Sequence, residues 1–318
     1  MNLQPLRHFS HPVALASEVA ERPVASNLLD ERLVLFRTAE GVSACHDLCI
    51  HRGTPLSLGR VEDDCLVCAY HGWKYAADGR CVQIPSLPAG RPIPAKAGVT
   101  AYRAAERYGL IWVCLDEPRA PIPPFPEHGD PAYERYFAGA YVWEASAARM
   151  IENFMDLAHL PWVHPEILGD PDDHAVPPHQ VETLDDGLCF EYAIKGPSQG
   201  AKYQGGGTIN HCQRLYLPFT IHHTRLAENR RMANFFTCQP ISATRTRRYM
   251  WVTRTGQFDA PIEESQAITD LIREQDEGIV QAQRPEELPI DLSAELHLHG
   301  SDAVAVAYRR QLAGFAIE

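Results

Sequence analysis

Residues 49–75, CIHRGTPLSLGRVEDDCLVCAYHGWKY, decide the fold of the N-terminal part of this chain. They contain two Cys-x(n)-His pairs, Cys49 with His51 and Cys68 with His71, and 16 residues separate the pairs. Short β-rich runs bounded by Gly, Pro, Asp and Asn lie around them, at 32–38, 65–70, 81–84 and 109–115. This part of the chain is therefore predicted to be a small antiparallel β domain in which two loops present metal-ligand side chains.

The four side chains favour an iron–sulfur cluster over a single ion. Two thiolates and two neutral imidazoles are the ligand set of a Rieske [2Fe-2S] centre. Gly53 and Gly72 follow the histidines, where the backbone would pass close to inorganic sulfur, and Tyr70 and Trp73 are placed to exclude water. The alternative is a structural zinc site of four thiolates, which would leave both histidines unexplained; its ligands would be Cys45, Cys49, Cys65 and Cys68.

A proline-rich segment separates two parts of different character. Residues 117–131, EPRAPIPPFPEHGDP, hold six prolines, which neither continue a helix nor donate to a sheet, so a linker is expected there. We expect one domain over 1–120 and a second over 121–318. The second shows helical periodicity at 143–160 and 262–283 and strand-like runs at 188–194, 214–224, 232–241 and 246–254. The predicted fold class is α+β, with an all-β domain followed by an antiparallel sheet with helices.

A second candidate metal site lies at residues 152–164, ENFMDLAHLPWVH. Asn153, Asp156 and His159 recur every three residues, which predicts one helical face, and Pro161 is expected to break the helix before His164. Two histidines that approach from different directions supply two positions of a facial triad for iron(II), with a carboxylate from elsewhere. Asp156 is a candidate for orienting His159, and Asn153 for lining the pocket.

The two loops and the second motif together resemble the Rieske non-haem iron ring-hydroxylating oxygenases, in the subgroup that includes vanillate O-demethylase and dicamba monooxygenase. In that family the first loop commonly reads Cys-Pro-His-Arg-Gly, and Ile50 stands here in place of the proline. The resemblance implies that Asp276 is the third iron ligand, with Glu274 and Glu277 as rivals. It also implies that Asp156 bridges His159 to His71 of a neighbouring subunit.

The resemblance further implies a terminal oxygenase of a multicomponent system active in aromatic compound catabolism. A reductase or ferredoxin would deliver electrons from NADH, because no G-x-G-x-x-G follows a predicted strand. The expected reaction is O₂-dependent monooxygenation, by hydroxylation or oxidative O- or N-demethylation, of an aromatic substrate such as an aromatic acid. The expected assembly is a homotrimer. The alternatives are a cis-dihydroxylating dioxygenase, a non-enzymatic Rieske electron carrier and a zinc-stabilised binding module.

Composition limits the partners and the compartment. The 41 acidic and 29 basic residues of the 318 give a net charge of −12, which disfavours nucleic acid and anionic membranes. No secretory segment is visible and nine cysteines suit a reducing compartment, so the cytoplasm is expected. Isolated histidines are expected to be structural, namely His211, His222 and His223. Arginines on one predicted strand are candidates for a substrate carboxylate, although exposed strand arginines are commoner; they are Arg245, Arg247 and Arg248.

Overall fold

The computed structural model describes residues 3–196, 200–204, 207–258 and 260–315. The chain forms two compact units, one of Leu6–Ile122 and one of Pro123–Glu318 with Met1–Pro5. The chain boundary between Ile122 and Pro123 lies inside the proline-rich segment. Among the described residues no helix is long and apolar enough to cross a membrane.

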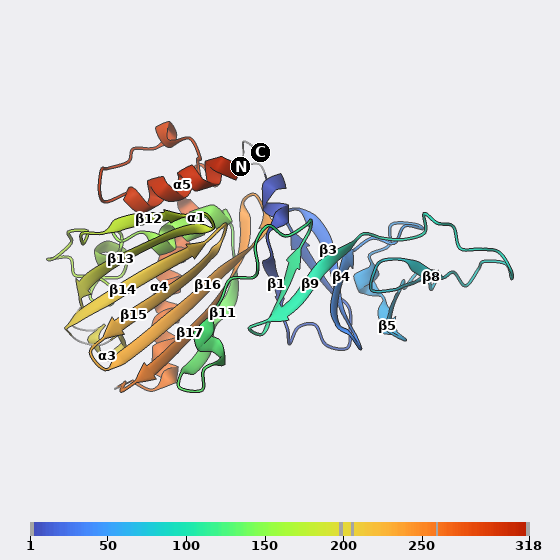
Figure 1. Ribbon diagram of the computed structural model, residues 1–318, viewed down its shortest axis with the longest axis horizontal. Helices are drawn as coiled ribbons and strands as arrows, with labels where there is room; N and C mark the ends of the chain where they lie inside the picture. The colour runs from blue at the N-terminus through green and yellow to red at the C-terminus, as the bar shows by residue number, and fades with distance from the viewer. Residues whose placement is uncertain (1–2, 197–199, 205–206, 259, 316–318) are drawn as a thin grey trace. The chain divides into compact units, whose positions relative to one another are not determined.

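The first unit consists of two antiparallel sheets (Figure 1). The larger has the order β1-β10-β9-β4-β3-β2, with β1 at His11–Leu15, β2 at Val24–Leu28, β3 at Glu31–Thr38, β4 at Gly41–His46, β9 at Ala101–Arg107 and β10 at Leu110–Cys114. The smaller has the order β5-β6-β7-β8, with β5 at Arg60–Glu62, β6 at Cys65–Val67, β7 at Lys74–Tyr75 and β8 at Cys81–Gln83. The short 3₁₀ helices are η1 (Gln4–His8) and η2 (Leu56–Leu58).

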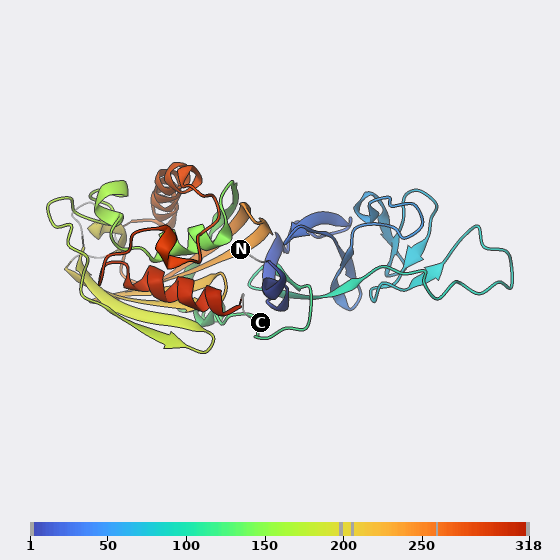
Figure 2. The same cartoon turned by 90° about the horizontal axis from the view of Figure 1, so that it is seen from above.

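A seven-stranded antiparallel sheet organises the second unit. Its order is β11-β17-β16-β15-β14-β13-β12, with β11 at Glu134–Trp143, β12 at Gln180–Leu184, β13 at Gly187–Lys195, β14 at Thr208–Tyr216, β15 at Thr220–Ala227, β16 at Arg230–Ser242 and β17 at Arg245–Gly256. The helices are α1 (Ala147–Met155), α2 (Leu160–Val163), α3 (Ala201–Gln204), α4 (Ile262–Ala282) and α5 (Ala303–Phe315), with η3 at Pro126–Gly129 and η4 at Leu292–Ala294. Figure 2 shows α1 and α4 on the same face of the sheet. The predicted α+β architecture is confirmed.

The helix predicted over 143–160 is wrong at both ends. Trp143 is the last residue of β11, and α1 begins only after Ser146, whose hydroxyl accepts the N–H of Arg149 as an N-cap. The helix ends at Met155 because Asp156 adopts an extended backbone. Its carboxylate accepts N–H groups of the residues that follow, a local bond that competes with the helix.

Pro161 therefore begins a helix and does not break one. It lies in the first turn of α2, where its missing N–H costs no helical hydrogen bond. Asn153 lies on α1, Asp156 caps it, and His159 is the N-cap of α2, so these three residues do not share one helical face as predicted.

The run 214–224, predicted as one strand, is a hairpin. It contains the end of β14 and the start of β15, which pair antiparallel through Tyr216 and Thr220. Pro218 lies in the turn, and a proline has no N–H to donate to a ladder. The strand predicted over 65–70 is shorter than expected. It ends at Val67, the last residue of β6, and Cys68 begins a loop.

Candidate metal centres

The two Cys-x(n)-His loops have the same backbone geometry. In the first, the N–H of Cys49 donates to the carbonyl of Thr54 (2.9 Å) and the N–H of Gly53 donates back to the carbonyl of Cys49 (2.9 Å). The second loop makes both bonds at 2.9 and 3.0 Å, with Cys68, Gly72 and Trp73 in the equivalent places. The loops can therefore hold their cysteines in matched positions.

Glycine is needed in both loops for its backbone conformation. Gly53 has φ +68° and Gly72 has φ +69°, values in the left-handed region that other residues rarely adopt. A Cβ at Gly53 would meet no atom within 4 Å. Within the chain itself, the φ angle, rather than crowding, accounts for glycine at this position.

The loops place thiols inside and imidazoles outside. Cys49 and Cys68 are 3% and 1% exposed and pack in the core around the small sheet. The Nδ1 atoms of His51 and His71 lie 3.1 Å apart, His71 is exposed, and the ring of Trp73 stacks on His51. This donor set fits a cluster with a buried thiolate-bound iron and an outer imidazole-bound iron.

The geometry does not assemble the alternative four-thiol site. Over the described residues, only one group of three or more His, Cys, Asp and Glu has all its ligand atoms within 4.8 Å, and it contains no cysteine. Cys45 donates to the carbonyl of Ala77, and burial raises the pKa of its thiol to about 12. Cys45 therefore has the environment of a buried neutral thiol.

Two residues that the sequence analysis did not select support the first loop and its sulfur. The hydroxyl of Tyr75 lies 3.0 Å from the Sγ atom of Cys49, where it can donate to a thiolate. The buried carboxylate of Asp47 accepts both the N–H (2.7 Å) and the hydroxyl (2.6 Å) of Ser57, which fixes the two ends of the loop.

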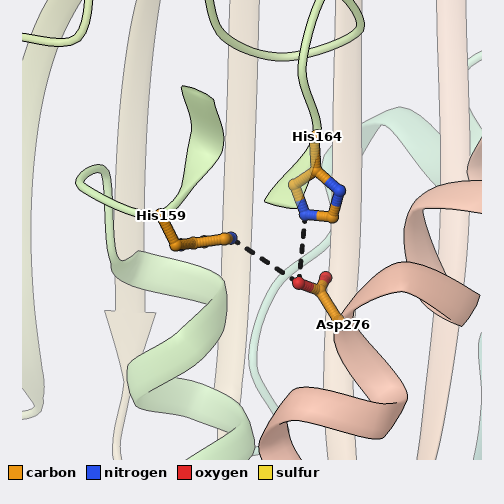
Figure 3. A group of neighbouring side chains, drawn as sticks. All are labelled: His159, His164 and Asp276. Atoms are coloured by element: carbon orange, nitrogen blue, oxygen red, sulfur yellow. Dashed lines mark hydrogen bonds and ion pairs between the residues drawn. The ribbon is translucent and has the colours of Figure 1, made fainter. Parts of the chain in front are cut away.

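The group within 4.8 Å is His159, His164 and Asp276 (Figure 3). The Oδ1 atom of Asp276, on α4, lies 3.0 Å from Nε2 of His164 and 3.6 Å from Nε2 of His159. The two imidazole planes are 75° apart, so the rings approach the carboxylate from different directions. Two imidazoles and one carboxylate on one side of a site form the facial arrangement that suits iron(II) with open positions.

Each imidazole is held by its other nitrogen. Nδ1 of His159 lies 3.0 Å from the carboxylate of Asp156, and Nδ1 of His164 lies 2.8 Å from the side-chain oxygen of Gln275. Because both partners are acceptors, each Nδ1 must carry the proton. The lone pair is then on Nε2 in both rings, the atom that faces Asp276. Gln275 was missed in the sequence, although it precedes Asp276 on the same helix.

The surroundings of Asp156 favour the ionised form of its carboxyl group. Its carboxylate accepts the N–H of Ala158 (2.9 Å) and of His159 (3.2 Å) besides the imidazole. Burial acts to raise the pKa of Asp156, but the imidazole and the two N–H groups together hold it below its ordinary value. Asn153 also lies at this centre, with its amide nitrogen 3.4 Å from Asp276.

The rival carboxylates on α4 have another partner. Arg273 binds Glu277 (2.6 Å) and Glu274 (2.9 Å), and neither glutamate belongs to the group around His164. On this turn of α4, Asp276 therefore faces the two histidines, whereas Glu274 and Glu277 bind the guanidinium of Arg273.

A cavity of about 130 Å³ adjoins the second centre. Its walls include His159, His164 and Asp276 as well as apolar side chains of α1, α4 and the sheet. His211 and His223, expected to be structural, line it and hydrogen-bond to each other at 2.9 Å. Burial and Arg225 lower the pKa of His211 to about 3, so it is neutral. His222 instead pairs with Glu127.

The histidines of the cavity could have been found from strand alternation. Positions 211 and 213 on β14 and 223 and 225 on β15 are polar, and each pair points to one face of its strand. Buried polar side chains on a sheet face covered by helices indicate a polar cavity and not a plain core.

Comparisons with known proteins agree with this geometry. Residues 9–103 match the family described as Rieske [2Fe-2S] domain, and residues 143–317 match the family described as Vanillate O-demethylase oxygenase C-terminal domain. Methylxanthine N1-demethylase NdmA of Pseudomonas putida is 30% identical over 96% of this chain and 88% of its own length. The vanillate O-demethylase oxygenase subunit of Pseudomonas sp. is 35% identical over 48% of this chain and 43% of its own length.

A solved structure extends the similarity to the fold. The structure of Pseudomonas putida CBB5 NdmA with caffeine superposes with a TM-score of 0.89 at 30% identity. The match covers 98% of this chain and 91% of that chain.

Proposed function

This chain belongs to the Rieske non-haem iron oxygenases, and we propose that it is a terminal oxygenase that carries out monooxygenation of an aromatic substrate. The observation that carries the proposal is the group of two imidazoles and one carboxylate at the wall of a cavity, in a chain that also has the two cluster loops. The relatives named as N- and O-demethylases favour oxidative demethylation or hydroxylation over cis-dihydroxylation.

We assign a ligand role to seven side chains. Cys49, His51, Cys68 and His71 hold a [2Fe-2S] cluster, and His159, His164 and Asp276 hold one iron(II). When bound, these groups supply one-electron transfer and O₂ activation, with electrons that originate from NADH and arrive through a separate reductase or ferredoxin. The fixed tautomers of both iron-site histidines support the second assignment, since they leave the lone pair on Nε2, the atom that faces Asp276 and that a metal ion would bind.

The remaining residues position the reactants. Asp156 and Gln275 hold the two imidazoles by Nδ1, so the rings cannot turn away from Asp276. Apolar walls from Phe154, Leu157 and Met250 exclude water from the cavity and favour a flat ring. An aromatic acid is the substrate class that we propose for this cavity.

Turnover of a substrate panel tests the proposal. Purified protein with a surrogate reductase is offered methoxybenzoates, N-methyl heterocycles and simple benzoates under ¹⁸O₂. We expect at least one compound to gain a single labelled oxygen or to release formaldehyde in step with NADH consumption. The His164→Ala variant should keep the cluster spectrum and lose this turnover. Incorporation of both atoms of O₂ into a cis-diol would refute monooxygenation.

We also propose a cytoplasmic homotrimer assembled head to tail. The exposed position of His71 supports electron transfer to another subunit, with Asp156 of that subunit between His71 and the iron ligand His159. Heterologous contacts of this kind close into rings. Size-exclusion chromatography with light scattering should give three chains per particle, whereas a fully active monomer would contradict the intersubunit route.

A further inference from the structure

Arg248 is a buried cation in the wall of the cavity beside the second metal centre. It lies on β17, is 5% exposed and lines the same cavity as His164 and Asp276. Three aromatic rings surround its guanidinium, with centroids 5.6–5.7 Å from the central carbon atom; they are Tyr141, Trp143 and Phe236. The ring faces attract a cation but do not accept its N–H groups as an oxygen would, and the hydroxyl of Tyr141 donates to Asp270.

One edge of this guanidinium lacks a partner. Among the described residues, no hydrogen-bond acceptor meets the buried Nε and Nη2 atoms of Arg248. These two nitrogens form one side of the planar group, and their parallel N–H bonds match the two oxygens of a carboxylate. A buried polar edge without a partner is unfavourable, so its presence in a cavity wall indicates that a ligand completes it.

The side chain keeps its charge at neutral pH. Burial and the neighbouring Arg273 lower the pKa of Arg248 to about 10, which leaves it protonated at pH 7. In the described part of the chain, no carboxylate forms an ion pair with Arg248, although Asp276 attracts it from a distance. An unpaired buried cation is stabilised by an anion that enters its cavity.

The other arginines considered from the sequence lack this arrangement. Arg245 pairs with Glu144 at 3.0 Å and is half exposed. Arg247 lies over the ring of Tyr249 and belongs to the opposite face of β17, because successive strand residues alternate between faces. Arg273, which also lines the cavity, forms ion pairs with Glu274 and Glu277. Arg248 alone of these four combines burial, a cavity position and an open bidentate edge.

Neutral hydrogen-bonding groups lie elsewhere in the same cavity. Nε2 of His211 and Oε1 of Gln213 are buried and meet no hydrogen-bond partner within the described ranges, and both residues lie on β14. In the sheet order, β14 is three strands from β17, or about 14 Å at the usual strand spacing. Arg225 on β15 pairs with His211 in the sheet and donates to Asn234, so this end of the cavity also holds a cation, one that already binds a side-chain oxygen.

We propose that Arg248 is the specificity-determining residue that selects a carboxylate on the substrate, which its Nε–Nη2 edge binds in a bidentate manner. The inference rests on the proposed function, because it names the substrate group that the same cavity accepts. The acid is held at the β17 end, and the ring occupies the apolar part of the cavity. His211 and Gln213 are left for a polar ring substituent.

Matched acids and amides test this assignment without turnover. A panel of methoxybenzoates, hydroxybenzoates and heteroaromatic carboxylates, each with its carboxamide of the same shape, is titrated against the holoenzyme by calorimetry. We expect the wild-type protein to bind at least one acid more tightly than its amide. Arg248→Met should weaken that acid by about 30-fold or more, as for loss of one partner of a buried charged pair, and should leave the amide unchanged.

Two further variants complete the test. Arg248→Lys keeps the charge but loses the bidentate edge, so it should bind the acid with intermediate affinity and also covers the case in which Arg248→Met fails to fold. Arg247→Met removes the same charge from the other face of β17 and should keep the wild-type ratio of acid to amide affinity.

The outcomes separate this inference from the proposed function. Acid binding that depends on Arg248 but leads to no oxidation of any compound would preserve the inference and remove the proposed function. Oxidation with an acid-to-amide ratio that Arg248→Met and Arg248→Lys leave unchanged would overturn the inference and keep the function. A wild-type protein that binds no acid of the panel more tightly than its amide also overturns the inference.

Discussion

At the scale of single residues, the second centre uses two different acceptors for one purpose. A carboxylate holds Nδ1 of His159 and an amide oxygen holds Nδ1 of His164, and both leave Nε2 on the side of Asp276. The carboxylate also places a negative charge beside the ring of His159. The amide orients its ring without adding charge, so the two histidines are equivalent in geometry but differ in electrostatics.

Asp156→Asn should keep both metal sites and slow oxygenation severely, by about 10–100-fold or more. The carboxylate serves three N–H groups, whereas an amide has one acceptor oxygen and no charge. Iron content, the cluster spectrum and turnover of the variant are compared with those of the wild type. Near-normal turnover would show that Asp156 is needed neither for electron transfer nor for the orientation of His159.

Gln275→Leu should weaken iron binding at the second centre by about 10–100-fold, because the ring of His164 loses the acceptor that fixes its tautomer. Competition with a chelator, followed by iron analysis, measures the effect. Glu274→Gln is the matched control, since its side chain is largely exposed and pairs with Arg273. Equal iron retention by both variants would show that His164 needs no support from Gln275.

The sequence indicated the ligand types and one supporting residue, Asp156, but not the other supports. Cys49, His51, Cys68 and His71 could be selected because residue type and local spacing define the two loops. Tyr75 and Gln275 could not, because they lie 26 and 111 residues from the side chains that they contact. Those distances are set by the tertiary fold, and a tyrosine or glutamine has many other uses.

At the scale of elements, local hydrogen bonds overrode periodicity between β11 and α2. The apolar spacing of 143–160 predicted one helix, but Ser146 and Asp156 cap a shorter one at its two ends. The strands were predicted better, because β13, β16 and β17 alternate or run apolar over their full lengths. A serine or aspartate can cap a helix only when the backbone around it already has the right conformation. The sequence alone therefore does not show where this helix begins and ends.

A buried ion network joins α1, which precedes the second centre, to α5. Arg309, 2% exposed, binds both carboxylate oxygens of Glu152 at 2.6 and 2.7 Å and also reaches Glu295 at 2.6 Å. Burial acts to raise the pKa of Glu295, but Arg149 and Arg309 hold it below its ordinary value of 4.5. The network thus stabilises the fold when these carboxylates are ionised.

Arg309→Met should lower the free energy of unfolding of the second unit by about 3 kcal/mol at pH 7, because two carboxylates lose a buried partner. Since the folded pKa of Glu295 is depressed, its contribution is present above pH 4.5 and is lost as the pH falls through the folded value. The difference between wild type and variant should therefore shrink in acid.

Calorimetric unfolding at pH 7 and at a pH well below 4.5 measures this difference. Arg310→Met, at the exposed neighbouring position on α5, is the control and should unfold like the wild type. A destabilisation by Arg309→Met that is the same at both pH values would show that it comes from lost packing and not from the ion network.

At the scale of the whole molecule, the ligand sets of the two metal centres lie in two different compact units. Cys49, His51, Cys68 and His71 belong to the unit Leu6–Ile122, and the facial triad belongs to the unit that begins at Pro123. Each unit supplies its own loops, core and supporting hydrogen bonds. The proposed oxygenase therefore needs both groups in one chain, and an electron-carrier protein would need only the first.

Metal analysis and electron paramagnetic resonance of one anaerobically reduced sample test this central claim most directly. Two ligand sets predict two cluster irons and one mononuclear iron per chain, together with a Rieske-type signal from a cluster held by two thiolates and two imidazoles. A four-thiolate ferredoxin signal, or a colourless protein that holds only zinc, would contradict the assignment of His51 and His71 and with it the proposed oxygenase.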